Sequence, residues 1–528
     1  METLKENTRN EEYRSLLKES GADDDVVELL LDRERLLSKK PFTRGGTVKS
    51  GGRTQKVGAG GKVRAQLPRI KREVVSQDRY CAELDPYMHD VLFDDNIPSI
   101  CVKVQNGGTM EMKMAKMAYP FQQIIMEKQT LHMSCLPLAF TLSDKKPTDA
   151  MQEDFVTFKH YWNLRNQDGM KTKMVATAKS YGEAGLLFYL DRHGEIKSRL
   201  ISYEDGYVIC SHNDANGDRM LETVYYMDSD GNEVIDSWDD TNLYRYTTTD
   251  TGDWKLEVVP HGFPEIPLVT KRTMVAWDRG QTQIEGYERA ANIDNVIDTK
   301  WGWGLLYVKG RIDPNAKKIA GNIVLNDTSI DPSKSDAKFL EAPSAKNSNE
   351  KFEQRFKNIQ ISTGTTFILP SDIHTSSDTS GVAVQMTQSL DIQTAENGIV
   401  EWQNVVDKMV RLFKWGLAME QVNKGIKTDA VTEFAKMSIN AHMVIWKPYS
   451  EESYNQMLAT MKQAGILSQK SSIEQNTISR PDEVERVKAE EREALELEME
   501  KERRTKEIEA KYSKTAQNTS SGGASSAS

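Results

Sequence analysis

The sequence is poor in cysteine and contains no long hydrophobic run. Its 528 residues include four scattered cysteines without a C-x-x-C pair, namely Cys81, Cys101, Cys135 and Cys210. This pattern argues against a disulfide framework and against a cysteine-ligated zinc site. The N-terminus has no apolar signal region, and no stretch approaches the roughly 18 apolar residues that a membrane span needs. We therefore expect a soluble protein that is made in a reducing compartment.

Motifs that carry catalysis are also missing. No H-E-x-x-H, G-x-S-x-G or G-x-G-x-x-G pattern occurs, and the eight histidines are dispersed. The stretch GAGGKV (58–63) resembles a phosphate-binding loop, but it lacks the first Gly of that motif and has Val63 in place of the Ser or Thr that holds magnesium. His261 and His374 lie in suggestive places without a partner at a defined spacing. We therefore predict no catalytic residue, no metal site and no cofactor, although the many carboxylates leave paired acids possible.

Charge is distributed unevenly along the chain. The formal net charge is −10, and a chain this acidic does not grip a phosphate backbone broadly. Residues 39–72 nevertheless carry eleven Lys and Arg, seven Gly and no acid. This composition is typical of a flexible basic arm or long loop. A solvated loop is favoured there over a nucleic-acid contact.

Three helical patterns precede residue 184. They cover residues 21–37, with acids in the first turn, 109–129, which is rich in Met, and 151–166. The last pattern places Phe155, Phe158 and Trp162 on one stripe. We predict that this helix stops at Asp168-Gly169.

From residue 184 the pattern changes from helix to strand. Short β-rich runs follow one another: LLFYL, IKSRLIS, GYVICS, LETVYYM, NEVIDSW, LYRYTT and WKLEVV. They are separated by the turn dipeptides His193-Gly194, Asp205-Gly206, Asn216-Gly217, Asp230-Gly231 and Thr251-Gly252. Regular turn dipeptides between short strands predict an antiparallel meander.

Helices return beyond residue 260, around a small β module. Two helices are predicted over 281–301 and 348–364, with a β/loop module at 304–345 between them. In the first helix, Glu285 and Arg289 are spaced for an i,i+4 ion pair. A loop rich in Ser, Thr and Asp then leads into a long helix, a strand in SINAHMVIW and a charged helix beyond Pro481.

The order of these parts resembles the portal, or head-to-tail connector, proteins of tailed double-stranded-DNA phages, in the siphophage-type family. Five segments between roughly residues 170 and 500 carry the resemblance: SYGEAGLLFYLDRHGEIKSRLISYEDGYVI, HGFPEIPLV, LLYVKGRID, SGVAVQMTQSLDIQTAEN, and QAGILSQKSSIEQ followed by PDEVERVKAEE. They depart from the family's pattern at Gln393 and Gln469, where Lys is usual. Each segment alone is a weak signal, but the five occur in the family's order.

The resemblance implies an α+β portal fold that assembles into a ring. Together with the patterns above, it predicts the following parts: an N-terminal helical segment (1–38), a basic Gly-rich arm or loop (39–75), a wing of helices plus the antiparallel meander (76–270), a stem helix (271–303), a clip (304–346), a second stem helix (347–369), a tunnel loop (370–380), a long helix with the return strand of the wing (381–447), a helical crown (448–512) and a disordered tail (513–528).

The same resemblance implies the site residues. The tunnel loop is expected to reach into a central channel and contact DNA through Ser371, Asp372, Ile373, His374, Thr375, Ser376, Ser377 and Asp378. The helix after it would begin at Ser380-Gly381, since these are residue types that favour a helix N-terminus and a tight entry. Stem candidates to line the channel are Glu285, Glu288, Asp294 and Asp298; the alternative is that they only solvate the helix or pair with Arg289 and Lys300. Clip residues expected to dock the motor and the adaptor are Lys309, Arg311, Lys317, Lys318 and Asn322.

The function implied is that of a portal protein at one vertex of the capsid, placed there after synthesis in the host cytoplasm. Family members form rings, usually dodecamers, through which DNA is packaged and later ejected. Expected partners are further copies of this chain, double-stranded DNA in the channel, the terminase large subunit, the major capsid and scaffolding proteins, and head-completion adaptor proteins. The chain itself is not expected to be an enzyme. A metal-dependent nucleic-acid-processing enzyme and a coiled-coil scaffold protein are the rival hypotheses, and neither explains the order of the parts.

Overall fold

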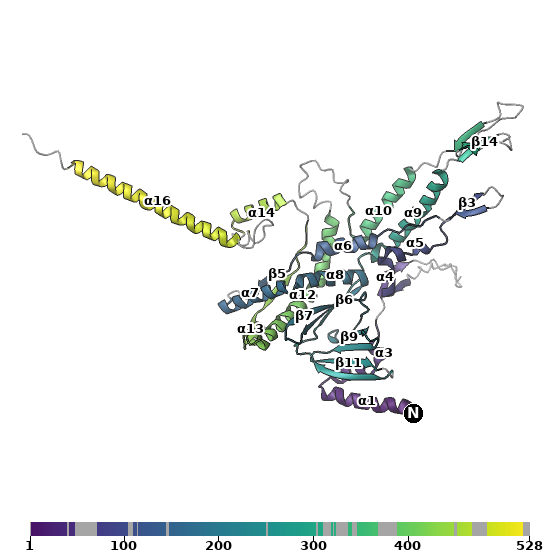
Figure 1. Ribbon diagram of the computed structural model, residues 1–528, viewed down its shortest axis with the longest axis horizontal. Coiled ribbons are helices and arrows are strands. Elements are labelled where there is room, and N and C mark those ends of the chain that lie inside the picture. The colour runs from purple at the N-terminus through teal and green to yellow at the C-terminus, as the bar shows by residue number, and fades with distance from the viewer. Residues whose placement is uncertain are drawn as a thin grey trace, which may run out of the picture. The chain divides into compact units, whose positions relative to one another are not determined.

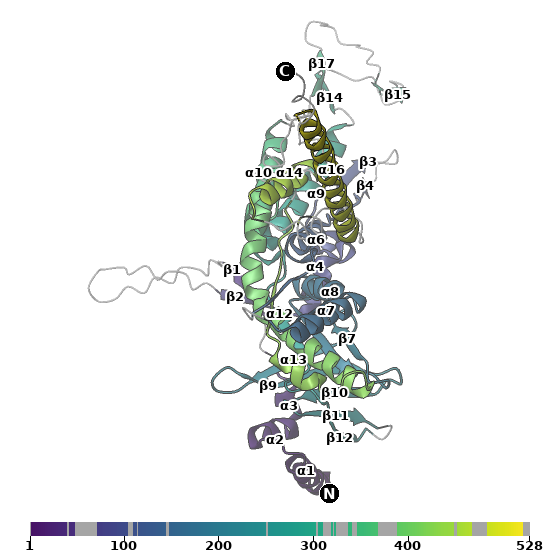
Figure 2. The ribbon, with the colours of Figure 1, turned by 90° about the vertical axis from the view of Figure 1, so that its left-hand side faces the viewer.

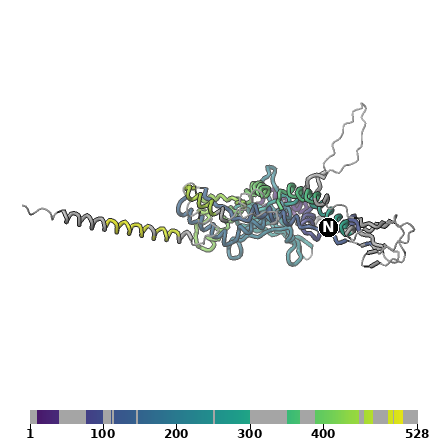
Figure 3. The backbone as a smooth tube through the Cα atoms, turned by 90° about the horizontal axis from the view of Figure 1, so that it is seen from above, coloured from purple at the N-terminus to yellow at the C-terminus, as the bar shows by residue number. Residues whose placement is uncertain are grey.

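A computed structural model of the protein divides the chain into two units (Figure 1). The larger comprises residues 1–372 and 388–447, and the smaller comprises 373–387 and 448–528. Figure 3 draws in grey the residues whose placement is uncertain. The described residues are 2–39, 42–47, 71–103, 109–112, 114–143, 147–249, 252–302, 305–309, 318–319, 322–323, 336–340, 346–367, 388–447, 451–466, 472 and 483–520.

The two largest sheets of the larger unit are antiparallel. The first consists, from one edge to the other, of β13 (Leu268–Arg272), β6 (Glu183–Leu190) and β7 (Ile196–Ile201). The second consists, from one edge to the other, of β12 (Trp254–Pro260), β11 (Asn242–Thr248), β10 (Glu233–Trp238), β9 (Arg219–Met227) and β8 (Val208–Asn213). All seven predicted runs are therefore strands. The turn glycines at 194, 206, 217, 231 and 252 each have a positive φ, as the turns between paired strands require.

Helices from the N-terminus pack on the five-stranded sheet. They are α1 (Glu2–Glu19), α2 (Asp24–Leu31) and α3 (Arg33–Leu36). Leu17 and Leu30 are fully buried there against Tyr244 of β11. The single helix predicted over 21–37 is wrong, because Asp32 leaves the helical conformation and caps α3 by accepting a hydrogen bond from the backbone N–H of Arg35.

Two consecutive helices precede the three-stranded sheet. These are α7 (Asp149–Leu164) and α8 (Gln167–Tyr181). The predicted helix stop at Asp168-Gly169 is wrong, because the break falls at Asn166, whose φ of 48° is left-handed. Asp168 instead lies in the first turn of α8, where it accepts hydrogen bonds from Trp162 Nε1 and from the backbone N–H of Leu138. Helix α8 was not predicted from the sequence, because Asp-Gly is a common turn dipeptide and was taken as the end of a helix.

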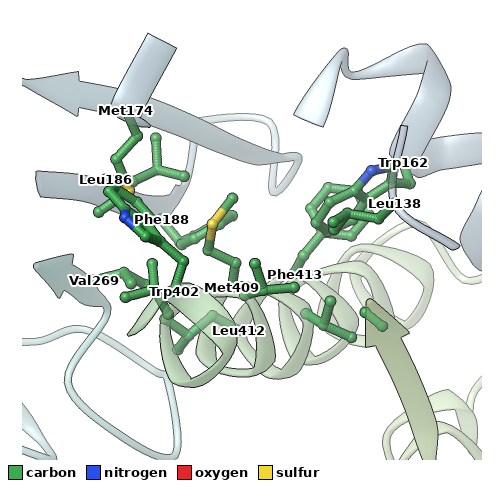
Figure 4. Close-up of a cluster of buried hydrophobic side chains, with 14 of the residues drawn as sticks. Leu138, Trp162, Met174, Leu186, Phe188, Val269, Trp402, Met409, Leu412 and Phe413 are labelled. Atoms are coloured by element: carbon green, nitrogen blue, oxygen red, sulfur yellow. The ribbon is translucent and has the colours of Figure 1, made fainter. Parts of the chain in front are cut away.

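The main core forms where the long helix α12 (Ser389–Asn423) crosses these elements (Figure 4). Its Trp402, Met409, Leu412 and Phe413 pack against apolar side chains from the other elements, namely Leu138, Trp162, Met174, Leu186, Phe188 and Val269. Gly416 of α12 lies so close to β7 that a Cβ there would be 2.2 Å from Ile196 Cδ1. The helices α6 (Phe121–Ser134) and α13 (Ala430–Lys436) complete this layer, and β5 (Ala139–Leu142) pairs with β18 (Ile439–His442).

The Met-rich helix predicted over 109–129 is wrong in its first half. Residues Thr109–Met112 form strand β4, which pairs with β3 (Ile100–Lys103), and α6 begins only at Phe121. Met residues alternate with charged residues in MEMKM, which is the two-residue period of a strand. Pro120 then restricts Tyr119 to non-helical conformations, so the helix starts after the proline.

A helix pair lies at the end of the larger unit that is opposite to α1 (Figure 2). It consists of α9 (Gln281–Gly302) and α10 (Lys346–Thr363), which we call the α9–α10 pair. Between them, β14 (Leu305–Lys309) pairs with β17 (Asp336–Leu340), and β15 (Lys318–Ile319) pairs with β16 (Asn322–Ile323). Beside α9 lie α4 (Gln77–Leu84), the short turn η1 (Pro86–Met88) and α5 (Asp90–Phe93).

Two boundaries differ from the predicted ones. Strands β1 (Phe42–Thr47) and β2 (Lys71–Val75) pair with each other, so both ends of the predicted basic arm have regular structure. In the smaller unit, α14 (Glu451–Gln463) is followed by α16 (Glu483–Ser520). The helix thus continues past residue 513, where the disordered tail was predicted, because no Gly or Pro occurs between Pro481 and Gly522. Within the described part of the chain, every helix is too short or too polar to cross a bilayer.

Candidate functional site: the α9–α10 pair and its surroundings

The two helices of the pair pack through aromatic and aliphatic side chains. Tyr287 of α9 meets Phe352 of α10 edge to face, with ring centroids 5.5 Å apart. Arg355 spans the pair and donates from Nη1 to the carbonyl oxygen of Gly286 at 2.7 Å. At the base, a Cβ on Gly280 would lie 2.4 Å from Thr363 Cγ2. A side chain at position 280 would therefore push the helices apart.

An aromatic cluster fixes the base of the pair to α6. Phe121 contacts Tyr287, Phe356 and Phe367, with ring centroids 5.3–6.1 Å apart. Trp277, Ile284 and Ile359 are fully buried in the same cluster. These contacts explain the apolar stripe that the sequence shows on α10, because its Phe356 and Ile359 face α6 and α9.

The other side of α9 meets the α4–α5 segment and residues 117–119 through polar groups. Glu288 Oε1 accepts from the backbone N–H of Tyr119 and lies 2.8 Å from His89 Nδ1. Asn292 pairs with the backbone of Met117, accepting from its N–H and donating to its carbonyl oxygen, both at 2.7 Å. Arg289 faces Asp94 with an N–O distance of 3.5 Å. Sequence reasoning missed these residues, because their partners are distant along the chain.

The four predicted channel acids do not share one environment. Glu288 is 2% exposed and bonded within the subunit, so the prediction that its carboxylate faces an open channel is wrong for this arrangement. Glu285 accepts from Gln281 and pairs with Arg79 at 3.3 Å; the expected pair with Arg289 does not form. Asp294 is half-buried, and Asp298 is exposed. Glu285 and Asp294 stand about two and a half turns apart on the helix and therefore on opposite faces.

Each helix of the pair keeps one face largely exposed, as the side chains described at 281–299 and 350–363 show. On α9 the exposed residues are Thr282, Gln283, Gly286, Arg289, Ile297 and Asp298. On α10 they are Glu350, Lys351, Glu353, Gln354, Arg355, Lys357, Asn358 and Ile361. These faces are available for contacts outside the subunit.

The predicted tunnel-loop residues 371–378 lie outside the described residues, as does the expected helix start at 380–381. The flanks of this segment are described, and they are bonded to each other. Asp391 accepts from the backbone N–H of Thr366 with both carboxylate oxygens, at 3.0 and 3.2 Å. Thr394 Oγ1 donates to the carbonyl oxygen of Gly364 at 2.9 Å, and Lys128 Nζ bonds to that of Thr366. The segment between residues 367 and 388 therefore leaves and rejoins the larger unit at one place.

Of the predicted clip residues and the two suggestive histidines, some lie among the described residues and some do not. Among the clip residues, Lys309 ends β14, Lys318 begins β15 and Asn322 begins β16, while Arg311 and Lys317 lie outside the described residues. Of the two suggestive histidines, His374 lies outside them as well. His261 has a structural role: its Nδ1 accepts from the N–H of Phe263 at 3.1 Å, and its Nε2 lies 3.0 Å from the carbonyl oxygen of Asp239. Burial lowers its pKa, so the ring is neutral.

Comparison with protein families decides the identity of the chain. Residues 91–497 match the family described as "Phage portal protein, SPP1 Gp6-like". The chain belongs to this family. The resemblance seen in the sequence is thereby confirmed, the mixture of helices and sheets fits the α+β portal fold, and the function is that of a portal protein. The family is structural rather than enzymatic, and the α9–α10 pair lies inside the matched range.

Known sequences and solved structures were compared with the chain as well. No curated protein sequence matches this chain. Among solved structures, it is similar to a chain of the "Neck of empty GTA particle computed with C6 symmetry", at 11% identity and a TM-score of 0.34, with 66% of this chain and 88% of that chain covered. It is also similar to a chain of the "Virion of native gene transfer agent (GTA) particle", at 10% identity and a TM-score of 0.33, with 66% and 85% covered.

Proposed function

We propose that this portal protein forms a closed, dodecameric ring at one capsid vertex and conducts double-stranded DNA through its centre. The α9–α10 pair carries the proposal. It is fixed to the subunit by an aromatic base and a polar side contact, yet one face of each helix remains exposed. A ring built by cyclic symmetry needs two different surfaces on each subunit, one for each neighbour. The two exposed faces supply such surfaces next to the ring axis.

The channel lining follows from which side chains are still free to reach it. Asp298 is the strongest of the predicted acids, because it is exposed on α9. Glu285 and Asp294 contribute less, since one is paired with Arg79 and the other is half-buried. Because DNA carries one charge about every 1.7 Å of its axis, a wall with few cations allows it to slide.

The tunnel loop, with Ser371–Asp378, is proposed to contact DNA in the channel. Support comes from its bonded flanks at Thr366 and Asp391, which hold the segment at a fixed base. Contact with DNA would then be shared among many polar side chains and repeated around the ring. No single residue of the loop, His374 included, would be indispensable.

The clip is proposed to be the docking surface for other components. It lies between the two helices of the pair, and its candidate residues are Lys309, Arg311, Lys317, Lys318 and Asn322. The terminase motor would bind there during packaging, and head-completion adaptors would replace it. Major capsid and scaffolding proteins would contact the outside of the ring while it assembles in the host cytoplasm. For the clip and the tunnel loop we keep the boundaries predicted from the sequence, which are 304–346 and 370–380.

Electron microscopy of the purified protein tests the ring. We expect closed rings with a central hole, and mass photometry at micromolar concentration should show a single large species. Exchanging Gly280 for Val pushes α9 and α10 apart at the base and should abolish rings, while exchanging the exposed Gln283 for Ala should keep the subunit fold. A strictly monomeric species, with no rings in assembled capsids, would overturn the proposal.

A further inference from the structure

His89 is buried between α4–α5 and α9 with an acceptor at each ring nitrogen. Its side chain is 4% exposed. Nδ1 lies 2.8 Å from Glu288 Oε1, and Nε2 lies 2.8 Å from the carbonyl oxygen of Glu83. A carbonyl oxygen and a carboxylate accept hydrogen bonds, and a neutral imidazole has only one N–H to donate. Because imidazole is more basic than a carboxylate, the extra proton resides on His89, and both nitrogens donate.

His261 shows the opposite arrangement in the same subunit. One of its nitrogens accepts from a backbone N–H and the other faces a carbonyl oxygen, so a neutral ring satisfies both contacts. Both histidines are engaged at both nitrogens. Only the geometry at His89 requires the charged form.

We propose that protonated His89 is a latch that fixes the stem helix α9 to the α4–α5 segment, and that loss of its proton at alkaline pH releases this contact. The latch joins His89 on one side to Glu288 on the other, and Glu288 in turn holds the N–H of Tyr119. Without the proton, either Glu83 or Glu288 loses its hydrogen bond to the ring. The latch operates within one subunit and does not rest on the ring.

The surroundings of His89 favour the charged form. A cavity of about 210 Å³ beside it is lined by charged groups from all three elements packed there: Arg79 and Glu83 from α4, Asp90 from α5 and Asp94 directly after it, and Glu285, Glu288 and Arg289 from α9. Five carboxylates thus face two guanidinium groups, and the excess of negative charge stabilises the imidazolium. Burial lowers the pKa of His89, but the hydrogen bond and the charge of Glu288 outweigh it and raise the pKa above its ordinary value.

The sign of the pH effect follows from this raised pKa. A histidine with a higher pKa in the folded state stabilises that state at acidic pH, below its unfolded pKa of about 6.5. The stabilisation is lost as the pH rises through the folded pKa. Other contacts of α9, such as Asn292 with Met117, do not titrate in this range. Alkaline pH therefore loosens α9 without detaching it.

Hydrogen exchange measured by mass spectrometry on the full chain tests the latch. Between about pH 6 and about pH 9, after correction for intrinsic exchange, amide protection of α9 and of residues 77–93 should fall severalfold, because the stabilisation by the protonated ring is lost. Protection of the five-stranded sheet should not change. Exchange of the ring C2 hydrogen reports the pKa of each histidine separately, and His89 should titrate at a higher pH than His261.

Two variants make the test specific. In Glu288→Gln the new carbonyl still accepts from Tyr119, and the new amide can donate to Nδ1 of a neutral His89. This variant should keep α9 equally protected at both pH values. His261→Gln removes a half-buried histidine without touching the latch. In this variant the protection of α9 should respond to pH as it does in the original chain.

Three results would overturn the proposal: equal protection of α9 at both pH values in the original chain, an unchanged pH response in Glu288→Gln, or loss of the response in His261→Gln. His89→Gln should lower the protection of α9 at acidic pH. If that variant fails to fold, the sheet also loses protection, and Glu288→Gln still decides the question.

Discussion

The N-terminal helices and α9 are attached to the rest of the larger unit by different kinds of contact. Helices α1–α3 meet the five-stranded sheet through buried apolar residues such as Leu17, Leu30 and Tyr244. Helix α9 meets the α4–α5 segment and residues 117–119 largely through charged and amide groups. Apolar contacts accompany them, with Tyr80 of α4 in the cluster of Ile284 and with Val91 and Ile97 beside Val296. Apolar contacts are insensitive to pH and salt, whereas buried ionic contacts respond to both. The contact of α1–α3 with the sheet also includes His212, whose Nε2 lies 2.7 Å from the carbonyl oxygen of Leu36 and whose pKa is lowered by burial. Since a histidine with a lowered pKa is neutral at neutral and alkaline pH, this contact is expected to change less than that of α9 as the pH rises from neutral.

Leu17→Ala is expected to have the largest effect, because it removes a fully buried side chain between α1 and the sheet. The free energy of unfolding should fall by about 2–5 kcal/mol. Leu16→Ala, at a neighbouring position that is 39% exposed, is the matched control and should cost less than ~1 kcal/mol. Urea unfolding followed by circular dichroism measures both. Equal costs would show that α1 is not packed on the sheet.

Asp391→Ala should be the next largest effect, since it leaves the N–H of Thr366 without its carboxylate partner. Losing a buried hydrogen bond in this way costs about 1–3 kcal/mol. Amide exchange at residues 364–367 should rise. Glu396→Ala changes an exposed carboxylate on the same helix and should leave that exchange unaltered. An identical response in both variants would contradict the bonded base of the loop.

Acidification should lower the stability of the chain around His261, whereas it should stabilise the contact of α9 at His89. Because burial lowers the pKa of His261, the unfolded state binds its proton more readily than the folded state. Stability there should fall as the pH drops below about 6.5, the ordinary pKa of histidine. Exchange of residues 261–263 at mildly acidic and neutral pH measures this change, and His261→Gln should abolish it. The same sign of response at α9 and at His261 would remove the distinction between the two histidines.

Asp298→Asn should have the smallest effect on stability, less than ~0.5 kcal/mol, because its carboxylate is exposed. If Asp298 lines the channel, its change should alter the rate of DNA packaging in assembled particles while unfolding stays the same. Glu288→Gln is the comparison, since that buried side chain does not face the channel. A packaging defect in Glu288→Gln alone would reverse the assignment of the two residues.

The features that the sequence predicted well are those set by local patterns. The meander was predictable because each strand is short and five of its six turns carry a glycine, at positions 194, 206, 217, 231 and 252. Local rules also misled: the alternation in MEMKM was read as helical, and Asp168-Gly169 was read as a terminator although Asn166 makes the break. The opposite faces of Glu285 and Asp294 could have been deduced from the helical period alone.

The contacts that decide the candidate site were beyond sequence reasoning. His89 and Glu288 are separated by 199 positions, and Asn292 and Met117 by 175. Nothing in either local sequence signals the partner, because a buried ion pair depends on how the elements meet. The family resemblance located the α9–α10 pair, but the assignment of its acids required knowledge of which side of α9 is covered.

The bond between Thr366 and Asp391 makes the segment between them a natural grafting position. Its two ends meet at a fixed base, so a foreign peptide inserted there does not have to span a distance that the subunit dictates. Entropy of closure changes by only about 1 kcal/mol for moderate differences in length. A lanthanide-binding or fluorophore-accepting peptide could therefore replace residues 372–377, and each subunit would carry one reporter at an equivalent place. If the segment contacts DNA in the channel as proposed, the emission of such reporters would follow the passage of DNA in real time.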